Sequence, residues 1–170
     1  MNIVSVDPGL KGAIAFFRAG NLETIKDMPI TNAKQAKGKT RKTYNEEKLC
    51  QIFSEEPYDW YIIEAQSLLP SDGKKAHAGL SEISGLIRGL LHGLGLGDRY
   101  ILVRPQKWQK FFFGKSPGNT KKLSVEKAEQ TWPERGFWRG EKGGLRDGRS
   151  DAALIGLYAI RSGIHNQGGK

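Results

Sequence analysis

The stretch NIVSVDPGLKGAIAFF (residues 2–17) decides the fold. It holds two apolar, β-branched runs, residues 2–7 and 12–17, on either side of a turn that begins with Pro-Gly. Residues 22–28 form a third run of the same kind. Such short connections can join only antiparallel neighbours, because a parallel crossover needs a dozen or more residues. The sequence therefore predicts a three-stranded antiparallel meander at the start of the chain.

Beyond the meander, the hydrophobic pattern alternates between helices and strands. Short apolar runs at residues 60–65 and 100–105 are typical of buried parallel strands. Amphipathic spacing predicts helices at about residues 44–53, 76–96, 106–113, 119–131 and 150–163, the last ending at Gly163. The polar segment 31–43 and the Gly-rich segment 133–148 are expected to be loops, the first of them mobile. We expect a single α/β domain over residues 1–170, with one mixed sheet flanked by helices.

The charge of the chain indicates a polyanionic partner. The sequence has 27 Lys and Arg against 18 Asp and Glu, a formal charge of +9. Residues 99–149 alone hold 13 basic and 5 acidic side chains, so the charge is concentrated in patches. Nucleic acid is the first candidate, and an anionic membrane is the second. The alternative is a soluble protein that is merely basic.

Other features exclude several classes of protein. Cys50 is the only cysteine, which excludes an intrachain disulfide and a thiolate metal site. The three histidines are too dispersed to indicate zinc, and we expect no small-molecule cofactor. No apolar run approaches the ~18–20 residues of a membrane span, and no secretory signal opens the chain. We expect a cytoplasmic protein of a bacterial or phage-infected cell, or an organellar one if a transit peptide has been removed.

Four carboxylates stand at positions where a basic protein has little reason to place them. Asp7 ends the first strand, and Glu64 is the only charged residue of another apolar run. A carboxylate in such a place is desolvated unless it is paired or binds a metal. Asp147 and Asp151 are four residues apart, on one face of the last helix if that helix begins near Asp147. Together they could hold two Mg²⁺ ions, with Mn²⁺ as a substitute, in the arrangement used for phosphodiester hydrolysis.

Each acid also has a simpler interpretation. Asp7 before Pro-Gly could belong to an Asx-turn, and Glu64 could be half of an ion pair. Asp151 could merely complement the helix dipole. A helix capped at Ser150 would leave Asp147 in the preceding loop.

Several motifs, in order, resemble one family. The segments SVDPGLKGAIAFF, YIIEAQ, VRPQKWQKFFFGK, KKLSVEKA and SDAALIGLYA span about residues 2–162. They resemble the successive strands and helices of RuvC-type Holliday junction resolvases, in the phage and chloroplast branch. The resemblance implies an RNase H-like fold and metal binding by Asp7, Glu64 and Asp151. Bacterial members usually place a fourth ligand three residues before the last Asp, a position that is Gly148 here, so Asp147 departs from their pattern.

The resemblance also implies partners. It implies a homodimer that makes paired, symmetric nicks in a four-way DNA junction, and a two-fold dimer suits that substrate. The predicted helix 76–96 is the candidate dimer element, because small residues accompany its leucines, although a purely core-facing helix explains the leucines equally well.

The basic half of the chain supplies candidate DNA contacts. We expect phosphate contacts from Lys115, Lys121, Lys122, Arg146 and Arg149, with a solvated basic face as the alternative for each. Gln66 and Leu68 lie where the family inserts a wedge at the junction centre. Trp108 and Phe111 to Phe113 are expected in the core, and Trp138 is the better candidate for touching DNA.

Other functions fit the sequence less well. A broader RNase H-like nuclease, acting on flaps, branched DNA or RNA–DNA hybrids, is the main alternative. An actin-like kinase or ATPase needs two such lobes, and 170 residues supply one. The four acids argue against a nucleic-acid binder without catalytic activity.

Overall fold

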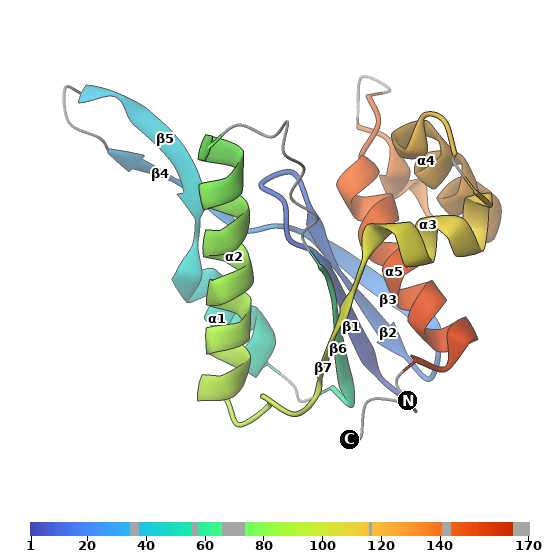
Figure 1. The fold of residues 1–170 in the computed structure, drawn as a ribbon, viewed down its shortest axis with the longest axis horizontal. Helices are drawn as coiled ribbons and strands as arrows, with labels where there is room; N and C mark the ends of the chain where they lie inside the picture. The colour runs from blue at the N-terminus through green and yellow to red at the C-terminus, as the bar shows by residue number, and fades with distance from the viewer. Residues whose placement is uncertain (35–37, 56–57, 66–73, 116, 141–143, 165–170) are drawn as a thin grey trace.

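A five-stranded mixed sheet forms the centre of the molecule (Figure 1). The computed structural model describes residues 1–34, 38–55, 58–65, 74–115, 117–140 and 144–164. The strand order is β3-β2-β1-β6-β7. The strands are β1 (Ile3–Asp7), β2 (Ala13–Arg18), β3 (Asn21–Asp27), β6 (Trp60–Glu64) and β7 (Tyr100–Val103). β1 to β3 are antiparallel, whereas β6 and β7 run parallel to β1, so the predicted meander and mixed sheet are confirmed.

Helices cover both faces of this sheet. In Figure 1, α1 and α2 lie on one side and α3, α4 and α5 on the other. Their bounds are α1 (Glu46–Ser54), α2 (Lys74–Gly93), α3 (Pro105–Phe113), α4 (Thr120–Thr131) and α5 (Asp147–Ser162). Gly163 ends α5 in the left-handed conformation, as predicted. None of the helices in the described ranges is long and apolar enough to cross a membrane.

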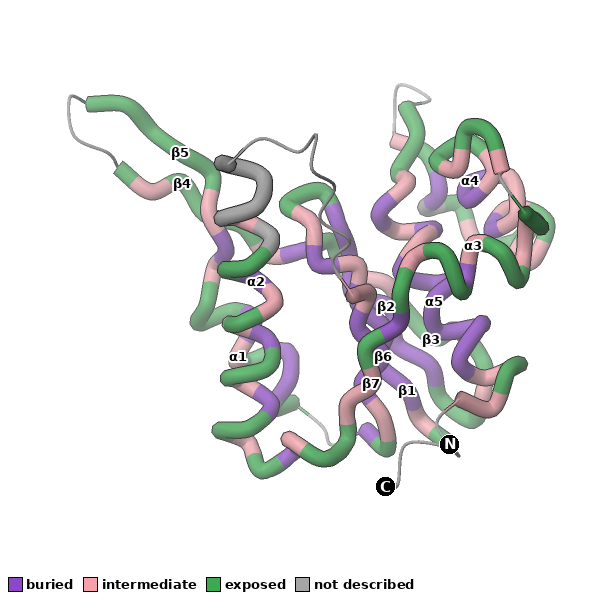
Figure 2. Tube along the Cα trace, viewed as in Figure 1, coloured by how far each residue is buried: buried purple, intermediate pink, exposed green. Residues whose placement is uncertain are grey.

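Each face of the sheet has its own hydrophobic core. Alternate residues of a strand point to opposite faces, so Val4 and Val6 pack towards α1 and α2, while Ile3 packs towards α5. The Ser5 hydroxyl, on the same face as Ile3, donates a 2.7 Å hydrogen bond to the carbonyl of Ala152 in α5. Figure 2 shows that the inner strands and the middle of α5 are buried. The core thus fixes α5 directly against β1.

The segment predicted to be a mobile loop is instead a β-hairpin. β4 (Ile30–Lys34) and β5 (Thr40–Tyr44) pair antiparallel as a separate two-stranded sheet. The hairpin extends away from the central sheet, and most of its residues are exposed (Figures 1 and 2). The loop prediction was wrong because an exposed hairpin lacks the hydrophobic alternation that reveals a half-buried strand.

Trp138 corrects a second expectation. It lies in a short 3₁₀ turn, η2 (Gly136–Trp138), within the segment predicted to be a loop. Its side chain is only 2% exposed and stacks on Trp132, with ring centroids 5.6 Å apart. Trp138 is therefore a core residue and is not positioned to touch DNA. Conversely, Phe111 is 48% exposed although the sequence placed it in the core, whereas Trp108 is fully buried as expected.

Candidate active site

Two carboxylates lie side by side where parallel strands end. Val6 of β1 is in register with Ile63 of β6, so the next residues, Asp7 and Glu64, occupy adjacent positions at the carboxyl edge of the sheet. The Asp7 carboxylate also accepts a 3.2 Å hydrogen bond from the Gly9 amide. The Asx-turn interpretation of Asp7 is thus correct in geometry, and it orients a carboxylate that lies beside Glu64.

The first turns of α5 bring the other two acids to the same edge. α5 begins at Asp147, so Asp147 and Asp151 lie one turn apart on one face, and the alternative that left Asp147 in a loop is wrong. Ser150 does not cap the helix; its hydroxyl donates instead to the carbonyl of Asp147 at 2.9 Å. At Gly148 any side chain would collide with the backbone carbonyl of Lys11. This glycine allows the start of α5 to approach the turn that follows Asp7.

The carboxylates influence one another electrostatically. Burial raises the pKa of Asp7 from 3.8 to about 6; the Gly9 amide opposes the rise, and the charge of Asp147 adds to it. Burial, and then the charge of Asp7, raise the pKa of Glu64 to about 7. Burial also raises the pKa of Asp151 well above its ordinary value, and repulsion from Asp7, Glu64 and Asp147 contributes. Four acids from three separate segments therefore form one electrostatic cluster, which we call the acidic edge.

A cation from α4 offsets part of this negative charge. Lys121 of α4 forms a 3.0 Å ion pair with Asp147, and its pKa is raised by that hydrogen bond and charge, with further contributions from Asp151 and Asp7. The lysine side chain is 72% exposed, so the pair is open to solvent. Lys121, predicted to contact phosphate, thus lies against the acidic edge itself.

Two residues that the sequence did not assign to the site support it. The indole N–H of Trp108 in α3 donates a 2.9 Å hydrogen bond to Glu64 and lowers its pKa. Ser124 of α4 is buried beside Asp151 and favours its ionised form. However, neither Ser124 Oγ nor Asp151 Oδ1 reaches hydrogen-bond geometry with any described group. A buried indole N–H needs an acceptor, and this requirement was the one sequence signal for Trp108.

The chemistry of these residues fits a divalent cation of the Mg²⁺ type. Carboxylate oxygens are the ligands that hard cations prefer. Asp151 Oδ1 is buried without a hydrogen-bond partner, and a bound cation would supply one. Among the described residues, no three acidic, histidine or cysteine side chains already stand close enough together to hold a metal. Four carboxylates that repel one another are expected to stay apart until a cation draws them in.

The remaining predicted contacts lie in different surroundings. Arg149 makes a bidentate ion pair with Asp27, at 2.6 and 2.7 Å, and Lys122 pairs with Glu126 at 3.6 Å. Lys115 is exposed in the turn after α3. Their roles in DNA binding stay predictions, as does the dimer role of α2. Gln66 and Leu68, the predicted wedge, lie outside the described residues.

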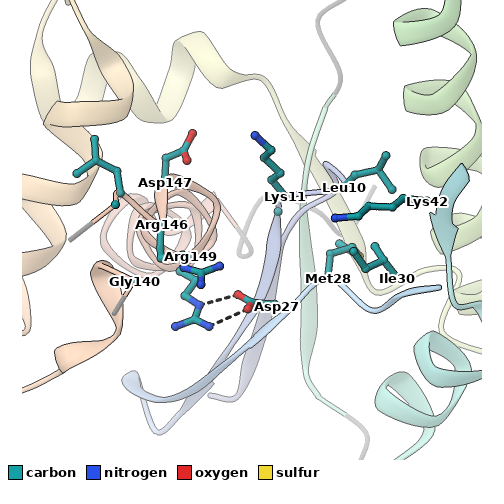
Figure 3. A pocket seen from close by; sticks show the side chains of 13 residues that line it. Leu10, Lys11, Asp27, Met28, Ile30, Lys42, Gly140, Arg146, Asp147 and Arg149 are labelled. Atoms are coloured by element: carbon teal, nitrogen blue, oxygen red, sulfur yellow. Dashed lines mark hydrogen bonds and ion pairs between the residues drawn. The ribbon is translucent and has the colours of Figure 1, made fainter. Parts of the chain in front are cut away.

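Next to the acidic edge is an open groove of about 850 Å³ (Figure 3). Asp147 lines it together with Arg146 and Arg149 of the α5 end. Its other walls come from the turn after β1, from the end of β3 and from the β4–β5 hairpin. Figure 3 shows Lys42 reaching in from the hairpin side, with the Asp27–Arg149 pair across the groove. Asp147 of the acidic edge and the basic hairpin thus border the same groove.

Comparison with solved structures shows which fold this is. RuvC from Thermus thermophilus superposes with a TM-score of 0.57 at 10% identity, over 96% of this chain and 97% of that chain. The same protein in complex with a Holliday junction substrate gives 0.59 at 12% identity, over 96% of each chain. The fowlpox virus Holliday junction resolvase gives 0.59 at 20% identity, over 95% of this chain and 99% of that chain.

The chain has the RNase H-like fold of these resolvases. The fold class predicted from the strand pattern and the motif resemblance is confirmed. No family model and no curated protein sequence matches the chain. At such low identities the likeness shows the fold alone, so the activity must be argued from the site.

Proposed function

We propose that this protein is a metal-dependent Holliday junction resolvase, an endodeoxyribonuclease that makes paired nicks in four-way DNA junctions. The observation that carries the proposal is the acidic edge, where Asp7, Glu64, Asp147 and Asp151 converge from β1, β6 and α5. A net charge of +9 on a chain that gathers four carboxylates at one edge suits a polyanionic substrate and a cation-assisted reaction. Of the structures with a similar fold, one is RuvC in complex with a Holliday junction substrate and another is named a Holliday junction resolvase. Both support the choice of substrate.

The four acids would hold two divalent cations, Mg²⁺ or Mn²⁺, when substrate is bound. Such ions supply an activated water and stabilise the leaving 3′ oxygen of the phosphodiester. The chain's own residues position the acids for this task. Trp108 fixes Glu64, the Gly9 amide fixes Asp7, and the Ser5 hydroxyl ties α5, and with it Asp151, to β1.

Substrate geometry then requires two sites. A junction has two equivalent strands to cut, and a two-fold dimer presents two equivalent acidic edges to them. We propose α2 as the dimer element: Ile83, Ile87 and Leu91 are buried against the sheet, while Gly85 and Gly89 have open space where a side chain would lie. A second copy of this helix would find room for a close approach there.

One assay tests the proposal against its main alternative. The protein is incubated with a four-way junction, a matched duplex, a flap and an RNA–DNA hybrid, each in Mg²⁺ and in EDTA. We expect paired, symmetric nicks in the junction, no cutting of the matched duplex, and no reaction in EDTA. Equal cutting of the flap or the hybrid would replace the proposal with a broader RNase H-like nuclease. Cleavage that persists in EDTA would overturn the metal-dependent mechanism.

A further inference from the structure

We propose that the β4–β5 hairpin is a DNA-binding arm that grips the phosphate backbone of substrate DNA outside the cleavage site. This inference rests on the proposed function for the identity of the substrate. It concerns a part of the chain that contributes nothing to the acidic edge. The groove of Figure 3 connects the two, with Asp147 at one wall and Ile30 and Lys42 of the hairpin at another.

The composition of the hairpin matches a polyanion. Between Ile30 and Tyr44 the sequence holds five Lys and Arg and no Asp or Glu. Two-stranded ribbons of this kind are marginal on their own, and this one buries little of its surface. A run of exposed like charges opposes compact folding, so a binding role explains the hairpin better than a structural one does.

Strand register sorts the hairpin's residues onto two faces. Ile30 is opposite Tyr44, and Asn32 is opposite Lys42. Lys34 is opposite Thr40, so these three pairs share one face. Because Ile30 and Lys42 line the groove, this is the groove face.

The opposite face of the hairpin has a partner within the chain. It carries Arg41, which lies 4.0 Å from Glu82 of α2. Lys34, Lys42 and nearby Lys11 have no ion-pair partner among the described residues. Of the cations in β4 and β5, Lys34 and Lys42 thus lie on the groove face, whereas Arg41 lies on the face towards α2.

The root of the hairpin is fixed to the turn that follows Asp7. The Tyr44 hydroxyl donates to the Pro8 carbonyl at 3.3 Å, one residue after Asp7. At the other strand, the amide of buried Met28 donates to the carbonyl of Gly12 at 2.9 Å. These contacts join the start of β4 and the end of β5 to the turn between β1 and β2. DNA held by the hairpin is therefore held in a set position relative to the acidic edge.

The salt dependence of binding tests the arm directly. The variant Lys34→Gln/Lys42→Gln is compared with wild type in EDTA, with an intact four-way junction as the probe. The slope of log K against log salt is negative, and each lost phosphate contact makes it shallower by about 1. We therefore expect the slope of the double variant to be shallower than that of wild type by about 2. Affinity should fall on the order of tenfold at moderate salt, and hydroxyl-radical protection of backbone beside the crossover should weaken.

A matched control removes two charges from the other end of the molecule. Arg99 immediately precedes β7, and Arg161 is in the last turn of α5, so both lie away from the carboxyl edge. The variant Arg99→Gln/Arg161→Gln should keep the wild-type slope. An equal loss of slope in both variants, or no loss in Lys34→Gln/Lys42→Gln, would overturn the arm. Tighter binding of an RNA duplex than of the DNA junction would overturn DNA as its partner.

The arm and the proposed function can fail separately. If wild type does not cut junctions but the slope difference persists, the arm stands and the resolvase proposal falls. If junctions are cut and both variants keep the wild-type slope, the resolvase proposal stands and the arm falls.

Discussion

The acidic edge and the β4–β5 hairpin border the same groove, yet they are built in opposite ways. The acids sit at the ends of β1 and β6 and on α5, where packing fixes the backbone and burial raises the pKa of Asp7 and Glu64. The described part of the hairpin has no core of its own beyond the buried Tyr44 at its root, and the charged side chains of β4 and β5 are exposed. Desolvated acids hold or release protons and cations, whereas exposed lysines attract phosphate over a distance. We therefore propose chemistry for the first region and substrate attraction for the second.

The largest effect is expected when a charge is removed from the acidic edge. Asp151→Asn keeps the shape of the side chain but removes a charge, so cleavage of the junction in Mg²⁺ should fall by about 10³-fold or more. Junction affinity in EDTA should be unchanged or higher, because a negative charge facing the phosphates is gone. Single-turnover cleavage and equilibrium binding measure the two effects, with exposed Asp98→Asn as the control. Weaker junction binding with a near-normal cleavage rate would show that Asp151 contributes to DNA binding and not to the chemistry.

A second prediction concerns pH and the metal-free protein. The folded-state pKa values of Asp7 and Glu64, about 6 and 7, lie above the ordinary 3.8 and 4.5. The folded state therefore holds protons that the unfolded chain has released. Stability from this source is fully present below about pH 4 and is lost as the pH rises through 6 and 7. At about 1.36 kcal/mol per unit of pKa, the two shifts together set an upper limit of about 6 kcal/mol on the loss.

Urea unfolding in EDTA from pH 5 to pH 8 measures this loss. The free energy of unfolding should decline over that range in wild type and decline less in Glu64→Gln. Added Mg²⁺ should restore stability to wild type at pH 8, because a ligand that binds only the folded state stabilises it. A flat profile in wild type would show that the acids are not desolvated together.

A smaller effect is expected where the fold supports the acids indirectly. Trp108→Phe keeps a buried ring but removes the indole N–H that holds Glu64. Loss of such a supporting contact typically costs about 10- to 100-fold in activity or metal affinity. The pKa of Glu64 should rise further, so the pH–rate profile should move to higher pH. If Trp108→Phe merely loosened the packing, the cleavage rate would fall but the pH–rate profile would not move.

The smallest effect is expected at the ion pair that ties α5 to β3. Asp27→Asn removes the bidentate partner of Arg149, at the start of α5. Because both side chains are partly exposed, the loss of stability should be about 1 kcal/mol or less. Glu129→Gln, which breaks the exposed ion pair between Glu129 of α4 and Arg139 beyond η2, is the matched control. Cleavage should fall several-fold in Asp27→Asn alone, and equal rates in the two variants would show that the pair does not position α5.

The two regions also differ in how far the sequence predicts them. Asp7 and Glu64 stand out because each is the charged end of an apolar strand, and the four-residue spacing placed Asp147 with Asp151. Those signals arise from burial, which leaves a pattern in the sequence. The hairpin buries little, so it leaves no such pattern and reads as a loop. The contact of Trp108 with Glu64 crosses 44 residues of chain, a separation that no local pattern encodes.

Trp138 illustrates the opposite error. Its neighbours in sequence are glycines and basic residues, which indicate an exposed loop, yet the ring is covered by stacking on Trp132. Local composition describes the segment, while the position of a large aromatic side chain is decided by the hydrophobic surface within its reach. Arg146, in the same segment, lines the groove as an interface residue would.

The mechanism proposed above gives Asp7 a role in the chemistry of cleavage and none in the recognition of DNA. It is tested by measuring cleavage in Mg²⁺ and binding in EDTA for Asp7→Asn, on the same four-way junction. We expect cleavage to be abolished while the affinity for the junction is retained or increased. Near wild-type cleavage by Asp7→Asn in Mg²⁺ would contradict it.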